Sequence, residues 1–181
     1  MNETLQKILQ KDTVQRTLKI AEEYCDFLEY VRLNEISQED FINRLHLLLT
    51  DLYQQSIRLP KIELIIEKEP KEIELKKHEP ILGDRLSEIL GKFTDYSEAF
   101  DPMIIEDKEN YLQGWLVDDL TDIYNDLYQI IEKIKINTDE YVQDGLWDLK
   151  FGLGTHWGHH LINALRFIHY LQYSNFARHM D

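Results

Sequence analysis

The sequence predicts an all-α protein, an antiparallel bundle of four to five long helices in a single domain. The 181 residues include only seven glycines and four prolines, so few positions break a helix. Several long segments repeat apolar residues at spacings of three and four, which is the pattern of an amphipathic helix. No repeat or linker divides the chain. We expect one domain over residues 1–181, with its core at about 12–173 and a frayed tail at 174–181.

The first third of the chain predicts one short helix and two long ones. Residues 2–11 form the short helix, and apolar residues line one face of the segment from about 14 to 32. Ser37 begins a capping box, Ser-Gln-Glu-Asp, which predicts the start of a helix over about 38–58. Pro60 favours an end to that helix, because the residue before a proline is pushed out of the α region.

The middle of the chain is less regular. Residues 60–80 alternate apolar and charged residues, which predicts a short β-hairpin. The connection between the two alternating runs contains Pro70 but no glycine, which suits a hairpin poorly, so an extended charged linker across the bundle is the alternative. We expect a short helix at 84–90 and a helical turn or loop at 93–103, whose aromatic residues would dock on the bundle.

Two long helices are expected in the last part of the chain, at about 109–135 and 140–173. The second one contains several glycines, each of which disfavours a helix interior. A kink or break at Gly152–Gly154 would make Thr155 a new N-cap. The alternative is that these glycines allow a neighbouring helix to approach closely.

The composition argues against several classes of function. The net charge is −14, and the densest basic run, residues 71–77, is interleaved with glutamates, so we expect no nucleic-acid partner. We find no apolar run of 18 residues and no signal peptide, which predicts a cytoplasmic protein without a membrane partner. The single cysteine, Cys25, is expected to be a buried small apolar residue.

His156 and His160 are the first candidate metal ligands. Their i, i+4 spacing places both on one side of a helix, where they could bind the same transition metal. No glutamate follows the first histidine, so the HExxH motif of metalloproteases is absent. A structural role is the alternative, in which both histidines flank a core stripe that includes Trp157. His159 falls on the far side of the helix and is expected to be exposed.

Aspartates on the helix at 109–135 could complete such a site. Carboxylates that face one another in a helical bundle can hold divalent cations. Asp119 and Asp126 lie at the boundary of the buried stripe, whereas Asp118 and Asp122 fall on the side that we expect to be solvated. Asp119 and Asp126 are therefore the metal candidates on this helix.

Trp157, Asn163 and Arg166 are candidate ligand-binding residues. Together they could line a small-molecule pocket, although aromatic residues at helical spacing more often belong to the core. The sequence contains no glycine-rich phosphate loop, nucleophile elbow or CxxC pair, so we expect no catalytic nucleophile.

Five motifs, in this order, resemble a bacterial family known as domain of unknown function 5063. They are EEYCDFLE (22–29), the LLLTDLY run that ends in Leu-Pro (47–60), FDPM (100–103), LTDIYNDLYQ (120–129) and HWGHHLINALRFIH (156–169). The resemblance covers about residues 10–172 and implies an all-helical fold. It implies no activity and no catalytic residues. Gly152 and Gly154 depart from the helical run that the family has before its last motif.

Three functions are consistent with these patterns. The leading hypothesis is a non-enzymatic cytosolic interaction or structural protein, which acts through its acidic surface or by self-association. The second is a metal-dependent hydrolase that uses His156, His160 and the helix aspartates. The third is a small-molecule sensor with a pocket near Trp157. No cofactor is expected except the divalent metal of the second hypothesis.

Overall fold

The computed structural model describes residues 1–68, 70–71, 79–99 and 111–173. The expectation of an all-α fold is confirmed in its helical part, since these residues form seven helices, but they also form one two-stranded antiparallel sheet. In chain order the elements are α1 (Glu3–Leu9), α2 (Asp12–Leu33), α3 (Gln38–Ser56), α4 (Glu79–Leu90), β1 (Asp95–Ala99), β2 (Tyr111–Trp115), α5 (Leu116–Ile136), α6 (Asp139–Thr155) and α7 (Trp157–Tyr173). The expected frayed tail, 174–181, lies outside the described residues.

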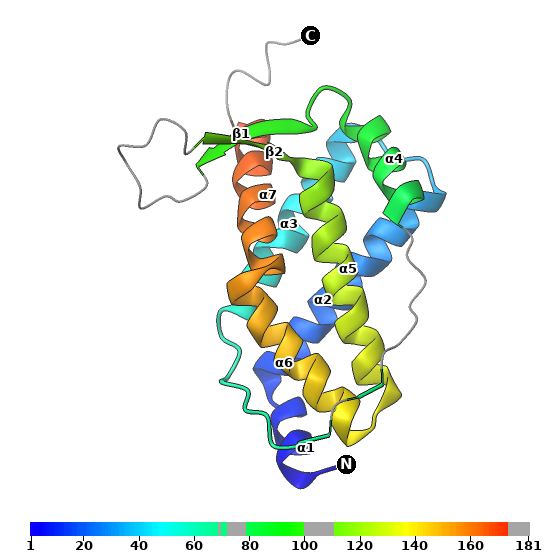
Figure 1. Ribbon diagram of the computed structural model, residues 1–181. Coiled ribbons are helices and arrows are strands. Elements are labelled where there is room, and N and C mark those ends of the chain that lie inside the picture. The colour runs from blue at the N-terminus through cyan, green and yellow to red at the C-terminus, as the bar shows by residue number, and fades with distance from the viewer. Residues whose placement is uncertain (69, 72–78, 100–110, 174–181) are drawn as a thin grey trace.

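The long helices lie side by side, and the β-hairpin crosses one end of the bundle (Figure 1). Helix α5 packs against α2, α4, α6 and α7, while α3 packs against α2 and α7. Helices α6 and α7 follow one another along one side of the bundle, and α1 lies at the end opposite the hairpin (Figure 1). None of the described helices is both long and apolar enough to cross a membrane.

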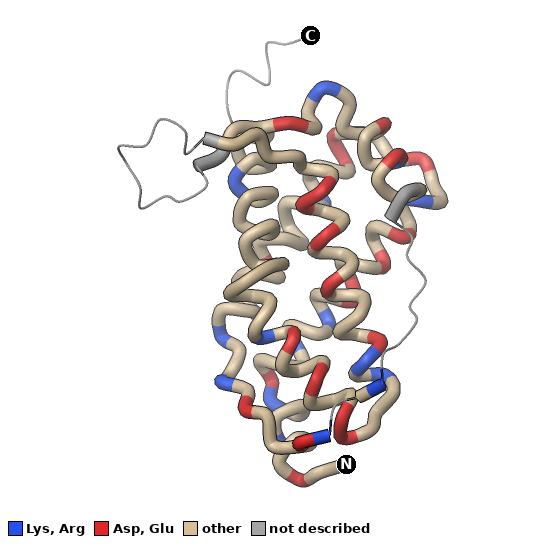
Figure 2. Tube along the Cα trace, viewed as in Figure 1, with Lys and Arg blue, Asp and Glu red and all other residues tan. Residues whose placement is uncertain are grey.

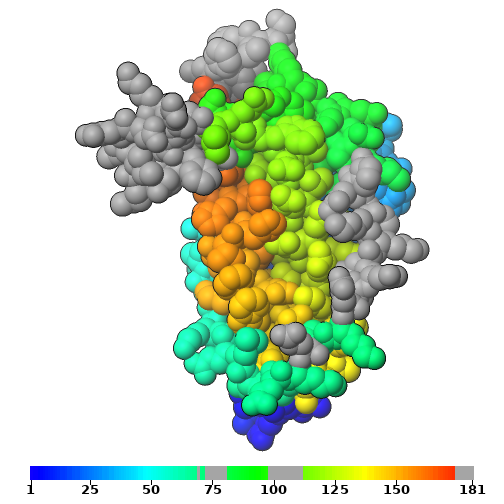
Figure 3. Space-filling view, in the orientation of Figure 1, coloured from blue at the N-terminus to red at the C-terminus, as the bar shows by residue number. Residues whose placement is uncertain are grey.

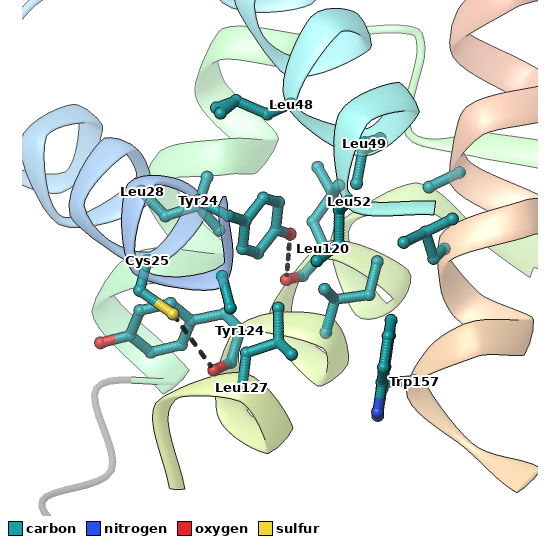
Figure 4. Packing of buried hydrophobic residues seen from close by; sticks show 14 of the residues in the cluster. Tyr24, Cys25, Leu28, Leu48, Leu49, Leu52, Leu120, Tyr124, Leu127 and Trp157 are labelled. Atoms are coloured by element: carbon teal, nitrogen blue, oxygen red, sulfur yellow. Dashed lines mark hydrogen bonds between the residues drawn. The ribbon is translucent and has the colours of Figure 1, made fainter. Parts of the chain in front are cut away.

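The core between α2 and α5 includes two polar contacts (Figure 4). The Tyr24 hydroxyl donates a hydrogen bond of 2.8 Å to the backbone oxygen of Leu120, so this fully buried phenol is satisfied. The Cys25 sulfur lies 4.0 Å from the backbone oxygen of Tyr124. Burial raises the pKa of the Cys25 thiol. Cys25 is thus a buried apolar residue, as expected.

The start of α3 confirms that Ser37 is its N-cap. The Ser37 hydroxyl accepts a hydrogen bond of 3.0 Å from the backbone amide of Asp40, and α3 begins at the next residue after Ser37. The predicted hairpin at 60–80 is wrong for its described part, because residues 60–68 and 70–71 form no strand. The side chain of Gln143 bonds the backbone of Ile65 and Ile66 instead, which agrees with the alternative of a segment that crosses the bundle.

Two other segments form the β-hairpin. We expected the first to be a helical turn or loop and the second to be the start of a helix. Residues 95–99 and 111–115 are paired strands, so the expected helix at 109–135 begins only at Leu116. Helix α4 begins at Glu79 rather than residue 84. The motif at 100–103 lies outside the described residues. Both strands are only five residues long, which is too short for periodicity to separate a strand from a helical turn, and this explains the error.

Gly114 determines how the hairpin meets the bundle. It pairs with Tyr96, and a Cβ atom on Gly114 would lie 2.4 Å from the Tyr96 ring. Because glycine has no side chain, the ring can lie across β2. Tyr96 is then 9% exposed and reaches α5, where it contributes to the site described below.

The predicted break in the last helix occurs at His156, after the glycines at 152–154. The backbone of His156 leaves the helical region (φ −146°, ψ −93°), and its carbonyl oxygen accepts the amide of His159 at 2.9 Å in the first turn of α7. The prediction that Thr155 caps the new helix is wrong. Thr155 ends α6, and its hydroxyl donates to the Phe151 carbonyl at 2.9 Å.

We expect the Gly158→Ala substitution to destabilise the fold by about 3 kcal/mol, because overpacking is costly where the obstacle is backbone. A Cβ atom on Gly158 would lie 1.9 Å from the carbonyl oxygen of Leu153. The matched control is Gly154→Ala, which meets nothing within 4 Å and should stabilise by about 0.5–1 kcal/mol. Urea unfolding of both variants measures the difference. Equal stabilities would contradict the close approach of α6 and α7.

Candidate metal centre

Three aspartates of α5 face the start of α7. Asp119, Asp122 and Asp126 follow one another at spacings of three and four, so they lie on one side of α5. His156 lies in the link between α6 and α7, and His160 lies in the first turn of α7. Figure 3 shows α7 in orange next to α5 in yellow-green on this face of the molecule.

Each histidine is paired with a carboxylate through its Nδ1 atom. Nδ1 of His156 lies 2.7 Å from Oδ2 of Asp126, and Nδ1 of His160 lies 2.8 Å from Oδ1 of Asp119. Nε2 of His160 lies 3.3 Å from Oδ2 of Asp122. The two imidazole rings are 5.0 Å apart between centroids and meet edge to face. The structure thus brings together all four residues that the sequence suggested as metal ligands.

The two pairings determine which nitrogen can bind a metal. An ionised carboxylate only accepts hydrogen bonds, so Nδ1 of each histidine carries a proton and donates it. In the neutral imidazole the lone pair is then on Nε2. Ligand atoms of Asp122, His156 and His160, one from each residue, all lie within 4.8 Å of one another. In known metal sites, too, a histidine ligand commonly donates its other ring N–H to a carboxylate.

Asp119 is the buried member of the site. Its side chain is 6% exposed, and one carboxylate oxygen accepts from His160 while the other accepts from the Tyr96 hydroxyl. The two donors come from different elements, α7 and β1. Both oxygens therefore have partners, which offsets the cost of burying a carboxylate.

The site perturbs the proton affinity of two of its members. The hydrogen bond with Asp119 raises the pKa of His160, although burial of the ring acts in the opposite direction. Burial is the main reason that the pKa of Asp122 is raised. Perturbed pKa values of neighbouring groups are a common property of functional sites.

Asp122 is the residue that sequence reasoning missed. We expected it on a solvated side of its helix, but its side chain is only 33% exposed because α7 covers the edge of the apolar stripe. Its spacing of three and four residues from Asp119 and Asp126 indicates that all three aspartates lie on the same side of the helix. His159 is exposed, as predicted.

The predicted small-molecule residues do not line one pocket among those that the described residues form. Trp157 is fully buried in the core, whereas Arg166 is exposed and donates to the Ser97 carbonyl at 3.2 Å near the hairpin. Arg166 lines a cavity of 360 Å³ with Tyr96 and Tyr170. Asn163 is half-buried between them along α7.

Comparisons with known proteins agree with the fold. The family described as Domain of unknown function (DUF5063) matches residues 9–174. The crystal structure of protein BF1032 from Bacteroides fragilis superposes with a TM-score of 0.76, at 26% identity, and the match covers 92% of this chain and 96% of that one. No curated protein matches the chain.

The Asp119–His160 pair predicts a pH dependence of the metal-free protein. Because the pKa of His160 is raised in the folded state, the pair stabilises fully below the ordinary pKa of about 6.5. That stabilisation is lost as the pH rises through the raised pKa. Thermal unfolding between pH 5.5 and 9 in the presence of a chelator measures this loss.

His160→Gln should reduce the pH dependence, and His159→Gln should leave it unchanged, because His159 bonds only the carbonyl of Gly154 among the described residues. An unchanged pH dependence in the His160→Gln protein would show that other groups are responsible.

Proposed function

Since this chain belongs to the family described as Domain of unknown function (DUF5063), we propose a function from its own side chains: it binds a divalent transition-metal ion through His156, His160 and Asp122. One observation carries this proposal, namely that each histidine has its Nδ1 atom held by its own carboxylate. Such a hydrogen bond fixes the tautomer and raises the basicity of a metal-binding imidazole. A pair of histidines that served only to fill the core would not need two separate carboxylates.

The ligand set favours particular metals. Two imidazoles and one carboxylate suit Zn²⁺, and the same set also binds Fe²⁺ in non-haem enzymes. Three protein ligands leave at least one coordination position for water or a substrate, which is the arrangement of catalytic rather than structural zinc sites. The His156 side chain is 53% exposed, so the site is accessible from solvent.

A metal-dependent hydrolase is the reaction class that this arrangement supports best. A metal with an open position lowers the pKa of its bound water and so supplies a nucleophile near neutral pH. Since we expect no catalytic nucleophile from the sequence, a reaction at this site would depend on such a water. Asp126 and Asp119, behind the two histidines, would orient the ligands and take no part in bond breaking.

An interaction protein is the second candidate, and the acidic surface favours it. The chain has a net charge of −14, and acidic residues recur along the visible side of α5 (Figure 2). A surface of this kind attracts basic partners and opposes self-association at low salt. Two results together would exclude this candidate. One is that sedimentation at low and high salt shows only a monomer, and the other is that an immobilised library of basic peptides does not retain the protein.

Metal binding is tested by titration of untagged, chelator-treated protein with Zn²⁺ in a calorimeter and with Co²⁺ by visible absorption. We expect one ion per chain, bound with an affinity that falls at acidic pH because protons compete for His160. His160→Ala should weaken binding by about a hundredfold or more, and Asp119→Asn by about 10–100-fold. His159→Ala is the control on the same helix. Wild-type affinity in the His160→Ala protein would exclude this site.

Asp122→Asn should separate stability from metal binding. Burial of this carboxylate disfavours its charged form, so the neutral amide should raise the thermal unfolding temperature of the metal-free protein at pH 7. The same variant should lose zinc affinity, because an amide is a poor ligand for this metal. Differential scanning calorimetry with and without Zn²⁺ measures both effects. A lower unfolding temperature without metal would contradict the assignment.

A further inference from the structure

A cavity of 360 Å³ lies where the β-hairpin crosses the end of α7 (Figure 1). Tyr96 and Ser97 line it from β1, and Arg166, Phe167 and Tyr170 line it from α7. Its volume is at the lower end of the range of about 300–1,000 Å³ that is common for small-molecule sites, so it suits a compact ligand. None of these residues is among the three candidate metal ligands, so the cavity can be tested independently of the metal centre.

Three of the five lining residues are aromatic. The rings of Tyr96 and Phe167 lie 5.0 Å apart between centroids, at an interplanar angle of 30°. The hydroxyl of Tyr96 bonds Asp119, so the ring is the part of this side chain that the cavity can use. Tyr170 is 55% exposed and adds a second tyrosine ring that solvent can reach. Such walls favour a ligand that is itself aromatic, because offset-stacked and edge-to-face ring pairs contribute more than the area that they bury.

Arg166 is the one charged side chain in the lining of this cavity. Its Nη2 atom donates to the Ser97 carbonyl at 3.2 Å, which holds the guanidinium against β1 and uses one of its five N–H donors. Arg166 forms no ion pair with any described residue, although the chain has 34 acidic residues and only 20 lysines and arginines. A guanidinium that the chain itself does not neutralise can bind an external carboxylate through two parallel hydrogen bonds.

We propose that this cavity binds a small aromatic carboxylate. One or two fused rings pack on Phe167 and Tyr170, and the carboxylate accepts hydrogen bonds from Arg166. A phosphate monoester is disfavoured, because its charge of about −1.5 to −2 exceeds that of one guanidinium in a chain whose net charge is already −14. An organic cation is disfavoured by the positive charge of Arg166.

Three probes of similar shape separate the contribution of charge from that of aromaticity: 2-naphthoate, its neutral amide 2-naphthamide, and the saturated decahydro-2-naphthoate. Each is titrated into the full chain by calorimetry in the presence of a chelator. We expect 2-naphthoate to bind most tightly, the amide about tenfold more weakly, and the saturated acid about three- to tenfold more weakly. Raised salt should weaken the two acids and leave the amide unchanged.

An amide or a saturated acid that binds as tightly as 2-naphthoate would overturn the proposal. So would the absence of 2-naphthoate binding at millimolar concentration.

Two arginines provide a matched pair of variants. Arg166→Gln should remove the preference for 2-naphthoate over 2-naphthamide and leave the affinity for the amide unchanged, which also shows that the variant is folded. Arg58 is exposed and does not line the cavity, so Arg58→Gln removes the same charge elsewhere and should preserve the preference. Equal losses in both variants would assign the effect to the general charge of the protein and contradict the site.

Tyr170→Leu tests the aromatic wall. This side chain is exposed, so its replacement by another apolar residue should leave the fold intact. The preference for 2-naphthoate over its saturated analogue should fall by about threefold, because the ring contact is lost while an apolar surface remains. A preference that stays as in the unmodified protein would show that the ligand does not pack on Tyr170 and would contradict the proposed position of the rings.

Discussion

The burial of α5 among α2, α4, α6 and α7 is the constraint on which the rest of the structure depends. A helix covered on so many sides has little surface left for its charged residues. Of its aspartates Asp118 is exposed, whereas Asp119, Asp122 and Asp126 are buried or half-buried and need donors at the seams between helices. Asp119 finds them at the seam with α7, where His160 and Tyr96 supply both of its hydrogen bonds. The same packing that forms the core thus produces a site with paired charges at its edge.

The helices with a strong helical period could be predicted from the sequence. Some residues of the candidate site could be predicted as well. The capping box at Ser37 identified the start of α3, because a local hydrogen bond defines it. His156, His160, Asp119 and Asp126 could be selected because spacing and the edge of an apolar stripe are local properties. Asp122 has the same spacing, but we assigned it to the solvated side, because its partial burial depends on the contact between α7 and α5.

The error at the β-hairpin has the same origin in a contact between distant segments. Neither 95–99 nor 111–115 has enough apolar residues to distinguish a strand from a helix or loop, and their pairing with each other selects the strand. The break in the last helix was expected at the glycines, where helix propensity is lowest. It occurs at His156 instead, and the next turn brings Gly158 against the Leu153 carbonyl.

The contact between Tyr96 and Asp119 gives the β-hairpin a second role besides covering one end of the bundle. The hydroxyl of Tyr96 and the imidazole of His160 share one carboxylate, so they compete for its electron density. Withdrawal of the tyrosine would leave more of that density to the histidine and make its ring more basic. Gly114, by leaving room for the tyrosine ring, therefore links the position of a hairpin to the chemistry of an imidazole on another element.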